Sequence, residues 1–233
     1  MTLADAANLH TFVDAFRFIG DNPGLLLHKA LEQLALSAAA LGIAAAVALP
    51  LGILLGHLHR GSGVAIGASI FGRALPSLVL IAAFLTVLGI GFVNNMVALA
   101  VLATGPMLTN AFYGVDEVDR DAVEAARGMG MTGLQILRRV ELPLSVPLLF
   151  TGIRIAAVTV VATAPIAAIA GGGGLGDIIV NQASYRLSGV LGASLCVMLL
   201  SALVFTGLLG LEIAVTPRGL RRTSVIGDPS ERS

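Results

Sequence analysis

The uncharged stretch Gln33–Gly56, QLALSAAALGIAAAVALPLGILLG, is 24 residues long. An α-helix needs about 20 predominantly apolar residues to cross the ~30 Å hydrocarbon core of a bilayer. The stretch therefore predicts a transmembrane helix. The polar residues His57, His59 and Arg60 follow it directly and predict that the helix leaves the membrane there.

The composition of the whole chain points the same way. Of its 233 residues, 56% are hydrophobic and 12% are charged, and the mean hydropathy is +0.92. Typical soluble domains are about 25% charged. These figures exclude a disordered chain and a coiled coil, and a single cysteine, Cys196, excludes a disulfide scaffold. The 14 basic and 14 acidic residues balance, so no strongly basic surface is available for nucleic acid. We therefore expect an integral membrane protein.

Further gaps between charged residues predict the remaining spans. The gap 74–115 is 42 residues long, about twice the length of one span, and has a turn signal in its middle. The turn residues are Gly89, Gly91, Asn94 and Asn95. We expect an all-α polytopic membrane protein with five spans. They lie near 33–56, 76–93, 96–112, 147–170 and 187–211.

The positive-inside rule orients these spans. Placing the loop 113–146 in the cytoplasm puts ten basic residues inside and three outside. Those inside are Arg60, Arg73, Arg120, Arg127, Arg138, Arg139, Arg218, Arg221, Arg222 and Arg232. Those outside are Arg17, Lys29 and Arg186. An odd number of spans separates the termini, so we predict the N-terminus outside and the C-terminus inside.

The two ends of the chain differ from the middle. Residues 1–24 are predicted to be an extracytoplasmic segment, and 214–233 a polar cytoplasmic tail. Asn22-Pro23 predicts a helix start with proline at the first helical position. Before it, apolar residues could anchor a short surface helix, although a loose tail fits equally well. These residues are Phe12, Phe16 and Ile19.

The loop 113–146 is the only long hydrophilic segment between predicted spans. Two pairs in it have the spacing of a capping box. They are Asp121 with Glu124, and Thr132 with Gln135. The first helix should end at 128–130, because glycine suits a left-handed stop. The second should end before Pro143. We expect two short helices joined by a glycine-rich corner.

Such a hairpin could be mistaken for a DNA-binding helix-turn-helix. Four basic and six acidic residues, however, give the loop a net charge of −2. A membrane-tethered, net-acidic hairpin is a poor reader of DNA. It is better suited to docking a cytoplasmic protein.

In this loop Glu124-Ala125-Ala126 is followed after three residues by Gly130, and after nine more by Val140-x-Leu142-Pro143. The pattern resembles the EAA motif of bacterial ABC importer permeases of the binding-protein-dependent, type I class. Val140 in place of isoleucine is the only departure. The resemblance covers roughly residues 25–213, which would form the permease domain.

The resemblance implies a coupling role for the loop. Glu124 would make a polar contact with the ATPase or brace the loop, whereas capping of its own helix is the alternative role. Ala125 and Ala126 would allow close helix approach, and Gly130 would form the corner. Leu142-Pro143 would begin the return to the membrane. Closure of the ATPase dimer would then move the spans as rigid bodies.

The resemblance also implies the partners. These are two ABC ATPase subunits, a second permease chain that is identical or paralogous, an extracytoplasmic solute-binding protein, and the lipid of the bacterial cytoplasmic membrane. A P-loop requires Gly-Lys-[Ser/Thr], but the only lysine, Lys29, lies between His28 and Ala30. ATP hydrolysis must therefore come from a partner chain. We expect a transport subunit that is not itself an enzyme and has no cofactor, metal or nucleic acid.

Two further stretches bear on the cargo. Arg73-Ala-Leu-Pro76-Ser77 and the glycine-rich 171–176 resemble the osmoprotectant permeases for glycine betaine, choline, carnitine and proline. Methionine permeases share the glycine-rich segment, so import of an amino acid is the alternative. An ATPase-independent channel or carrier would need acidic residues along its route, and the predicted spans contain almost none.

Several residues are candidates for the translocation path or its gate. They are Pro106, Asn110, Thr159, Thr163, Gly171, Gly173 and Gly176. The last three also fit G-x-G-x-x-G, but dinucleotide binding requires a preceding strand. Flexible backbone near the mouth of the path and a plain loop are both open. For the prolines and threonines, helix packing is the commoner use.

Arg154 lies inside the fourth predicted span. We expect it to extend to the interface along its aliphatic stem, with an ion pair to a neighbouring helix as the alternative. His57 and His59 are two residues apart and would point in different directions on a helix. That arrangement is poor for a metal, and we expect interfacial polar residues.

Overall fold

The fold consists of helices joined by short turns. A computed structural model describes residues 3–74 and 76–216, and within these ranges there is no strand. The helices are α1 Leu3–Asp21, α2 Pro23–His57, α3 Ser62–Ala74, α4 Ser77–Leu88, α5 Phe92–Asp116, α6 Arg120–Gly128, α7 Gly133–Ile136, α8 Leu142–Thr163, α9 Gly176–Val180 and α10 Gln182–Val215. A π-helical turn η1, Leu137–Glu141, precedes α8, and a 3₁₀ segment η2, Ala164–Ala170, follows it.

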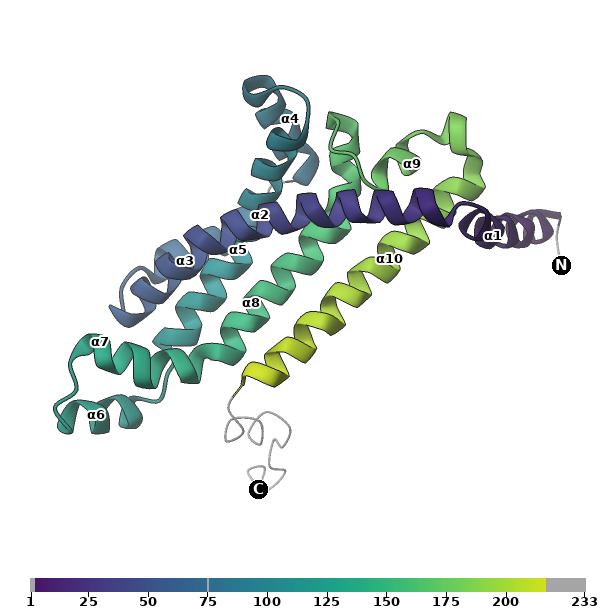
Figure 1. The fold of residues 1–233 in the computed structure, drawn as a ribbon. Coiled ribbons are helices and arrows are strands. Elements are labelled where there is room, and N and C mark those ends of the chain that lie inside the picture. The colour runs from purple at the N-terminus through teal and green to yellow at the C-terminus, as the bar shows by residue number, and fades with distance from the viewer. Residues whose placement is uncertain (1–2, 75, 217–233) are drawn as a thin grey trace.

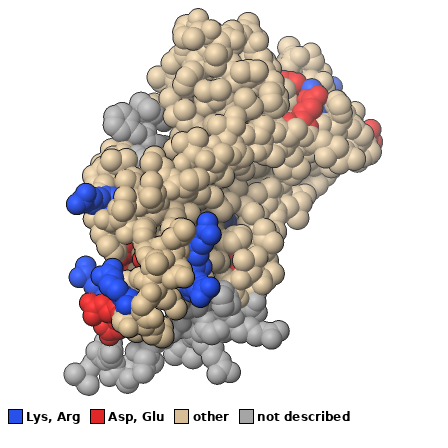
Figure 2. All heavy atoms as spheres, turned by 60° about the vertical axis from the view of Figure 1, so that its left-hand side comes forward, with Lys and Arg blue, Asp and Glu red and all other residues tan. Residues whose placement is uncertain are grey.

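The long helices form an elongated bundle. In Figure 1, α5, α8 and α10 run side by side, with α6 and α7 at one end and α4 and α9 at the other. Helix α5 lies at the centre, since it packs against α2, α3, α4 and α8. Figure 2 shows charged residues mostly toward the two ends of the visible face, with a largely uncharged surface between them. This distribution suits a membrane-embedded bundle.

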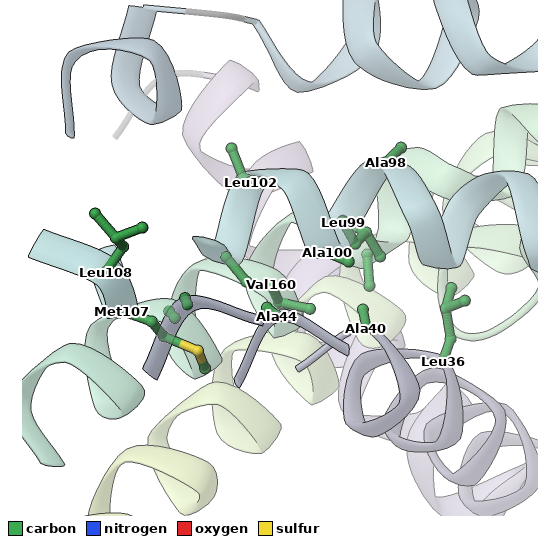
Figure 3. Packing of buried hydrophobic residues seen from close by; sticks show 14 of the residues in the cluster. Leu36, Ala40, Ala44, Ala98, Leu99, Ala100, Leu102, Met107, Leu108 and Val160 are labelled. Carbon is green, nitrogen blue, oxygen red and sulfur yellow. The ribbon is translucent and has the colours of Figure 1, made fainter. Parts of the chain in front are cut away.

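Helices α2 and α5 run parallel at very close range. A Cβ placed on Gly52 would lie 2.7 Å from Ala111 Cβ, and one on Gly56 would lie 2.6 Å from the backbone oxygen of Phe112. Further along, Ala40 and other small residues of α2 meet Leu99 of α5 (Figure 3). Small residues allow backbones to approach closely where lipid offers no hydrophobic driving force.

Helix α8 covers another side of α5 and runs antiparallel to it. Gly114 of α5 faces Ser145 and Leu148 of α8, whereas Gly152 of α8 faces Pro106 and Asn110 of α5. Because α2 and α5 run in the same direction, the chain between them must return along the bundle. Helices α3 and α4 both pack on α5 and form this return leg.

The predicted spans are confirmed in large part. Within the described residues, four helical stretches are long and apolar enough to cross a membrane: 23–57, 92–116, 133–170 and 182–215. The expected second span near 76–93 is shorter, because α4 has 12 residues and ends at Gly89, where φ is +76°. Helix α3 lies between the first two predicted spans, in a stretch for which no element was predicted. Together α3 and α4 contribute 25 helical residues, or about 37 Å.

The predicted helix start at Asn22-Pro23 is confirmed, since α2 begins at Pro23. Helix α1 precedes it, so the N-terminal segment is helical, and Phe12 and Phe16 are 50% and 65% exposed. Helix α10 has a non-helical residue, Arg186, with φ +58°. Its uninterrupted part thus begins where the fifth span was expected. Most of the predicted tail, 217–233, lies outside the described residues.

Replacing Gly52 with leucine should separate α2 from α5. Overpacking of this kind costs about 1–3 kcal/mol, so the temperature at which the purified protein loses its monodisperse elution peak should fall. Gly42→Leu is the matched control, because a Cβ there meets nothing within 4 Å. Equal thermal stability of the two variants would contradict the packing described here.

Candidate functional site

The segment between α5 and α8 is a helical hairpin, as expected. Asp119 caps α6, and its Oδ1 accepts a 2.9 Å hydrogen bond from the backbone N–H of Asp121. The expected cap at Asp121 is therefore wrong by two residues, because Asp119 has the extended backbone that a cap requires. The predicted corner is confirmed, since α6 ends at Gly128 and Gly130 has φ +81°. Only glycine adopts that conformation without strain.

The second half of the hairpin departs from the prediction at Pro143. Gln135 Oε1 accepts a 2.8 Å bond from the N–H of Thr132, which confirms the expected pairing. The helix does not end before Pro143, however. It continues through the π turn η1 into α8, and the N–H of Leu142 donates to the carbonyl of Leu137. A π turn changes which carbonyl each N–H bonds to along the helix. Proline has no N–H, so its position near the start of α8 leaves no donor unbonded.

The residues of the EAA motif lie on α6. Glu124 and Ala125 are exposed, and Ala126 is buried. Within the described ranges no hydrogen bond or ion pair engages the carboxylate of Glu124, so it does not cap its own helix. A cavity of about 290 Å³ opens beside it. Its lining includes Glu124, Arg120, Arg127, His59, Glu141 and three valines.

Two histidines join this hairpin to the end of α2. His57 Nδ1 lies 2.6 Å from Glu141 Oε2, and Glu141 is 2% exposed. His59 Nδ1 lies 2.8 Å from Asp116 Oδ1, at the end of α5. The expectation that these histidines are merely interfacial polar residues missed both carboxylates.

A second polar cluster lies at the opposite end of α2. Lys29 Nζ donates to Glu32 Oε2 at 2.9 Å and to Asp177 Oδ2 at 2.7 Å. Glu32 Oε2 also accepts the N–H of Gly174 at 3.0 Å. The cluster therefore ties α2 to the glycine-rich loop between η2 and α9.

Gly171 and Gly173 belong to this loop, and Gly176 directly follows it as the first residue of α9. Gly171 and Gly173 both have φ +72°, and a Cβ on Gly173 would lie 3.1 Å from Glu32 Oε2. Gly176 is buried, with its α-carbon against the backbone of Pro165. A cavity of about 390 Å³ beside the loop is lined by Lys29, Glu32, Ala35, Phe92 and Gly171–Gly173.

The other four path candidates lie elsewhere. Asn110 donates to the carbonyl of Pro106 at 2.8 Å, and the pair packs on Gly152 of α8. Thr159 donates to Ile155 at 2.7 Å within α8, and Thr163 precedes η2. The structure thus does not gather the seven candidates into one site, and only the three glycines lie together, in the loop after η2 and at the start of α9.

Four polar residues near the glycine-loop end are buried: the sequence analysis passed over two of them and took the two asparagines for turn residues, whereas both lie within α5. Gln33, Ser37, Asn94 and Asn95 are all 1% exposed or less. Gln33 donates to the carbonyl of Val161 at 2.9 Å, and Asn95 to that of Ala170 at 3.1 Å. The signal available was Gln33 and Ser37, spaced i and i+4 in an otherwise apolar run.

Arg154 forms an ion pair with Glu212 of α10, and its guanidinium lies 5.3 Å from the centre of the Phe205 ring. Both charged side chains are 17% exposed. The alternative expectation, an ion pair with a neighbouring helix, is confirmed. The partner is 58 residues away in the sequence, and it neutralises the charge within the bundle.

Comparison with known proteins agrees with the hairpin and the bundle. A family model described as binding-protein-dependent transport system inner membrane component matches residues 48–212. The glycine betaine/carnitine/choline transport system permease protein of Bacillus subtilis (strain 168) is 36% identical over 88% of this chain and 94% of its own length. The carnitine transport permease protein of Listeria monocytogenes is 37% identical over 91% and 97%.

Solved structures of similar fold include the inward-facing MetNI methionine ABC transporter. One of its chains superposes with a TM-score of 0.71 at 24% identity, covering 84% of this chain and 99% of the other. A chain of an amino acid ABC transporter crystallised with histidines gives 0.66 at 18% identity, with coverages of 84% and 96%. At these identities the likeness concerns the fold.

Replacing Glu212 with leucine should leave Arg154 unpaired among apolar helices. An uncompensated arginine in the membrane costs about 2–3 kcal/mol, so denaturation by SDS in bicelles should shift to a lower SDS fraction. The double variant Arg154→Met, Glu212→Leu should recover much of the loss, because replacing both members of a pair removes the buried charge. A double variant no more stable than Glu212→Leu would contradict the pairing.

Proposed function

The chain belongs to the family of binding-protein-dependent transport system inner membrane components, and we propose that it forms the membrane path of an ATP-driven importer of quaternary-amine osmoprotectants. Membership in the family makes it a multi-pass membrane protein and the permease subunit of an ABC transporter. The cargo, the residues that couple it to ATP hydrolysis and the composition of the assembly are the proposed parts.

The carboxylate of Glu124, which is exposed and has no hydrogen-bond or ion-pair partner among residues 3–74 and 76–216, is the observation that carries the coupling proposal. It lies on a short helix between two membrane-length helices. Ala125 and Ala126 give that helix little bulk, and Gly130 fixes the turn that presents it. We assign Glu124, Ala125, Ala126 and Gly130 to the contact with the ATPase. Leu142 and Pro143 continue the helix from there into the membrane.

The assembly would contain two ATPase subunits on the hairpin side, a second permease chain and a solute-binding protein on the opposite side. The sequence contains no P-loop, which supports a separate ATPase. Apolar side chains remain exposed in the single chain, among them Val87 at 79% and Ile90 at 80%. Such surface is suited to lipid or to a second permease chain.

The quaternary-amine cargo rests on the relatives named above. Their names assign glycine betaine, carnitine and choline, and the matches extend over most of both chains. The glycine candidates Gly171, Gly173 and Gly176 would shape the mouth of the path. Pro106, Asn110, Thr159 and Thr163 would contribute to its walls or to the helix packing that moves with it.

Replacing Glu124 with alanine should reduce uptake by roughly tenfold. A lost hydrogen bond to a charged group is worth about 1.5–3 kcal/mol, and about 1.4 kcal/mol corresponds to a tenfold change. Gly130→Val should act in the same direction by straining the corner. Uptake into proteoliposomes and ATPase retention on the purified permease measure both effects.

Glu117→Ala is the matched control, because Glu117 is an exposed carboxylate at the start of the same hairpin. It should retain normal uptake. If Glu124→Ala and Gly130→Val both show wild-type uptake and normal ATPase retention, the hairpin is not the coupling element.

Deleting the gene should abolish high-osmolarity uptake of labelled glycine betaine in a strain that lacks other betaine importers. Unlabelled choline, carnitine and proline should compete in the wild type, and methionine should not. Competition by methionine alone would indicate that the cargo is an amino acid. Uptake that persists after deletion would refute the proposed cargo.

A further inference from the structure

We propose that His57 and His59 are positioning residues that clamp the hairpin to the end of α2, so that α2 moves whenever the hairpin moves. The hairpin here means residues 117–141. The inference rests on the proposed function in one respect: it takes the hairpin as the element that the ATPase contacts and moves. The geometry of the two histidine–carboxylate pairs is independent of the cargo.

His57 holds the far end of the hairpin. His57 Nδ1 and Glu141 Oε2 share a hydrogen bond, and an ionised carboxylate only accepts, so Nδ1 is the donor when Glu141 is ionised. On the other edge of the ring, a Cβ built on Gly133 would lie 3.5 Å from Nε2. One imidazole therefore bonds to the last residue of η1 and lies beside the first residue of α7.

The π turn sets the side of the helix on which Glu141 lies. It inserts an extra residue into the helical register between α7 and α8, and Glu141 is its final residue. Within the described ranges, the buried Glu141 carboxylate has His57 as its only side-chain partner. A buried carboxylate without a partner is costly in free energy. If the hairpin moved away from His57, Glu141 would therefore have to find another partner or become exposed.

His59 holds the near end. Its backbone has φ +49°, a left-handed conformation that is uncommon for residues other than glycine. This turn follows the end of α2 and brings the ring back toward α5, where Nδ1 meets Asp116. Asp116 ends α5, directly before the hairpin. Two histidines at the C-terminal end of α2 thus contact the residue just before the hairpin, Asp116, and its last residue, Glu141.

The clamp connects the hairpin with the other end of the molecule. Helix α2 has 35 residues and is therefore about 52 Å long. At its opposite end Lys29 contacts Asp177 of α9, and Glu32 contacts Gly174 of the glycine loop. A displacement of the hairpin must either break the histidine pairs or carry α2, and with it the contacts on that loop.

The test measures the distance between α2 and α6 in the full-length chain, assembled with its ATPase subunits in nanodiscs. Spin labels are placed at Leu54→Cys and Asp121→Cys, both exposed positions, in a Cys196→Ala background. The cap bond at Asp121 uses only its backbone N–H, so the label leaves it intact. Double electron–electron resonance reports the width of the distance distribution.

The wild type should give one narrow distribution. The double variant His57→Ala, His59→Ala should broaden it roughly twofold, since the hairpin then samples several positions. The double variant His57→Asn, His59→Asn should restore the narrow distribution, because an asparagine amide places an N–H donor close to the position of Nδ1. His10→Ala, an exposed histidine on α1, is the control and should change nothing.

The second readout is the number of solute molecules imported per ATP hydrolysed. The double alanine variant should lower this ratio by about fivefold or more while ATP hydrolysis continues, and the asparagine variant should recover it. A wild-type distribution width in the alanine variant, or equal broadening in the asparagine variant, would overturn the clamp. A wild type that hydrolyses ATP but imports no quaternary amine would refute the cargo, and the distance measurement would still decide the clamp.

Discussion

At Gly56 a methyl group would meet the backbone oxygen of Phe112, and at Gly52 it would meet Ala111. This backbone-to-backbone approach of α2 and α5 is the constraint on which the remaining architecture depends. It fixes the two helices as parallel, which obliges α3 and α4 to return along the bundle. It also leaves another side of α5 free for α8, which approaches through Gly114 and Gly152 in the opposite direction. The histidine pairs follow from the same contact, because Gly56 immediately precedes His57 and lies against Asp116.

Polar contacts between segments distant in the sequence add to the close helix packing at glycine residues. Lipid tails are as apolar as leucine, so burial from water does not drive these helices together. Three of the ion pairs described above link segments that are far apart in the sequence: Lys29 with Asp177, Arg154 with Glu212, and His57 with Glu141. The first and third lie near opposite ends of α2. Fastening a long helix at both ends makes it a stiff connection between the hairpin and the glycine loop.

The features that were predictable from the sequence are those that local chemistry decides. Charge-free runs located the long helices, Pro23 marked the start of α2, and Gly130 marked the corner. What escaped prediction depends on residues distant in the sequence. Pro143 was expected to end a helix, but the π turn before it lets the helix continue into α8. Arg154 was expected at the interface because nothing in its own span reveals Glu212. The two histidines were judged only by their position relative to each other, which is poor for binding a metal. In the structure each one contacts a carboxylate on another element.

The glycine loop shows how one end of α2 can register a change at the other. Gly171, Gly173 and Gly174 all have positive φ, so the loop adopts a defined path that other residues would strain. The N–H of Gly174 bonds to Glu32, Lys29 bonds to Asp177 of α9, and Gln33 bonds to α8. A shift of α2 along its axis would change all three contacts together. A loop whose shape depends on contacts with one helix is therefore altered by any stroke that moves that helix, and no flexible linker needs to carry the signal across the membrane.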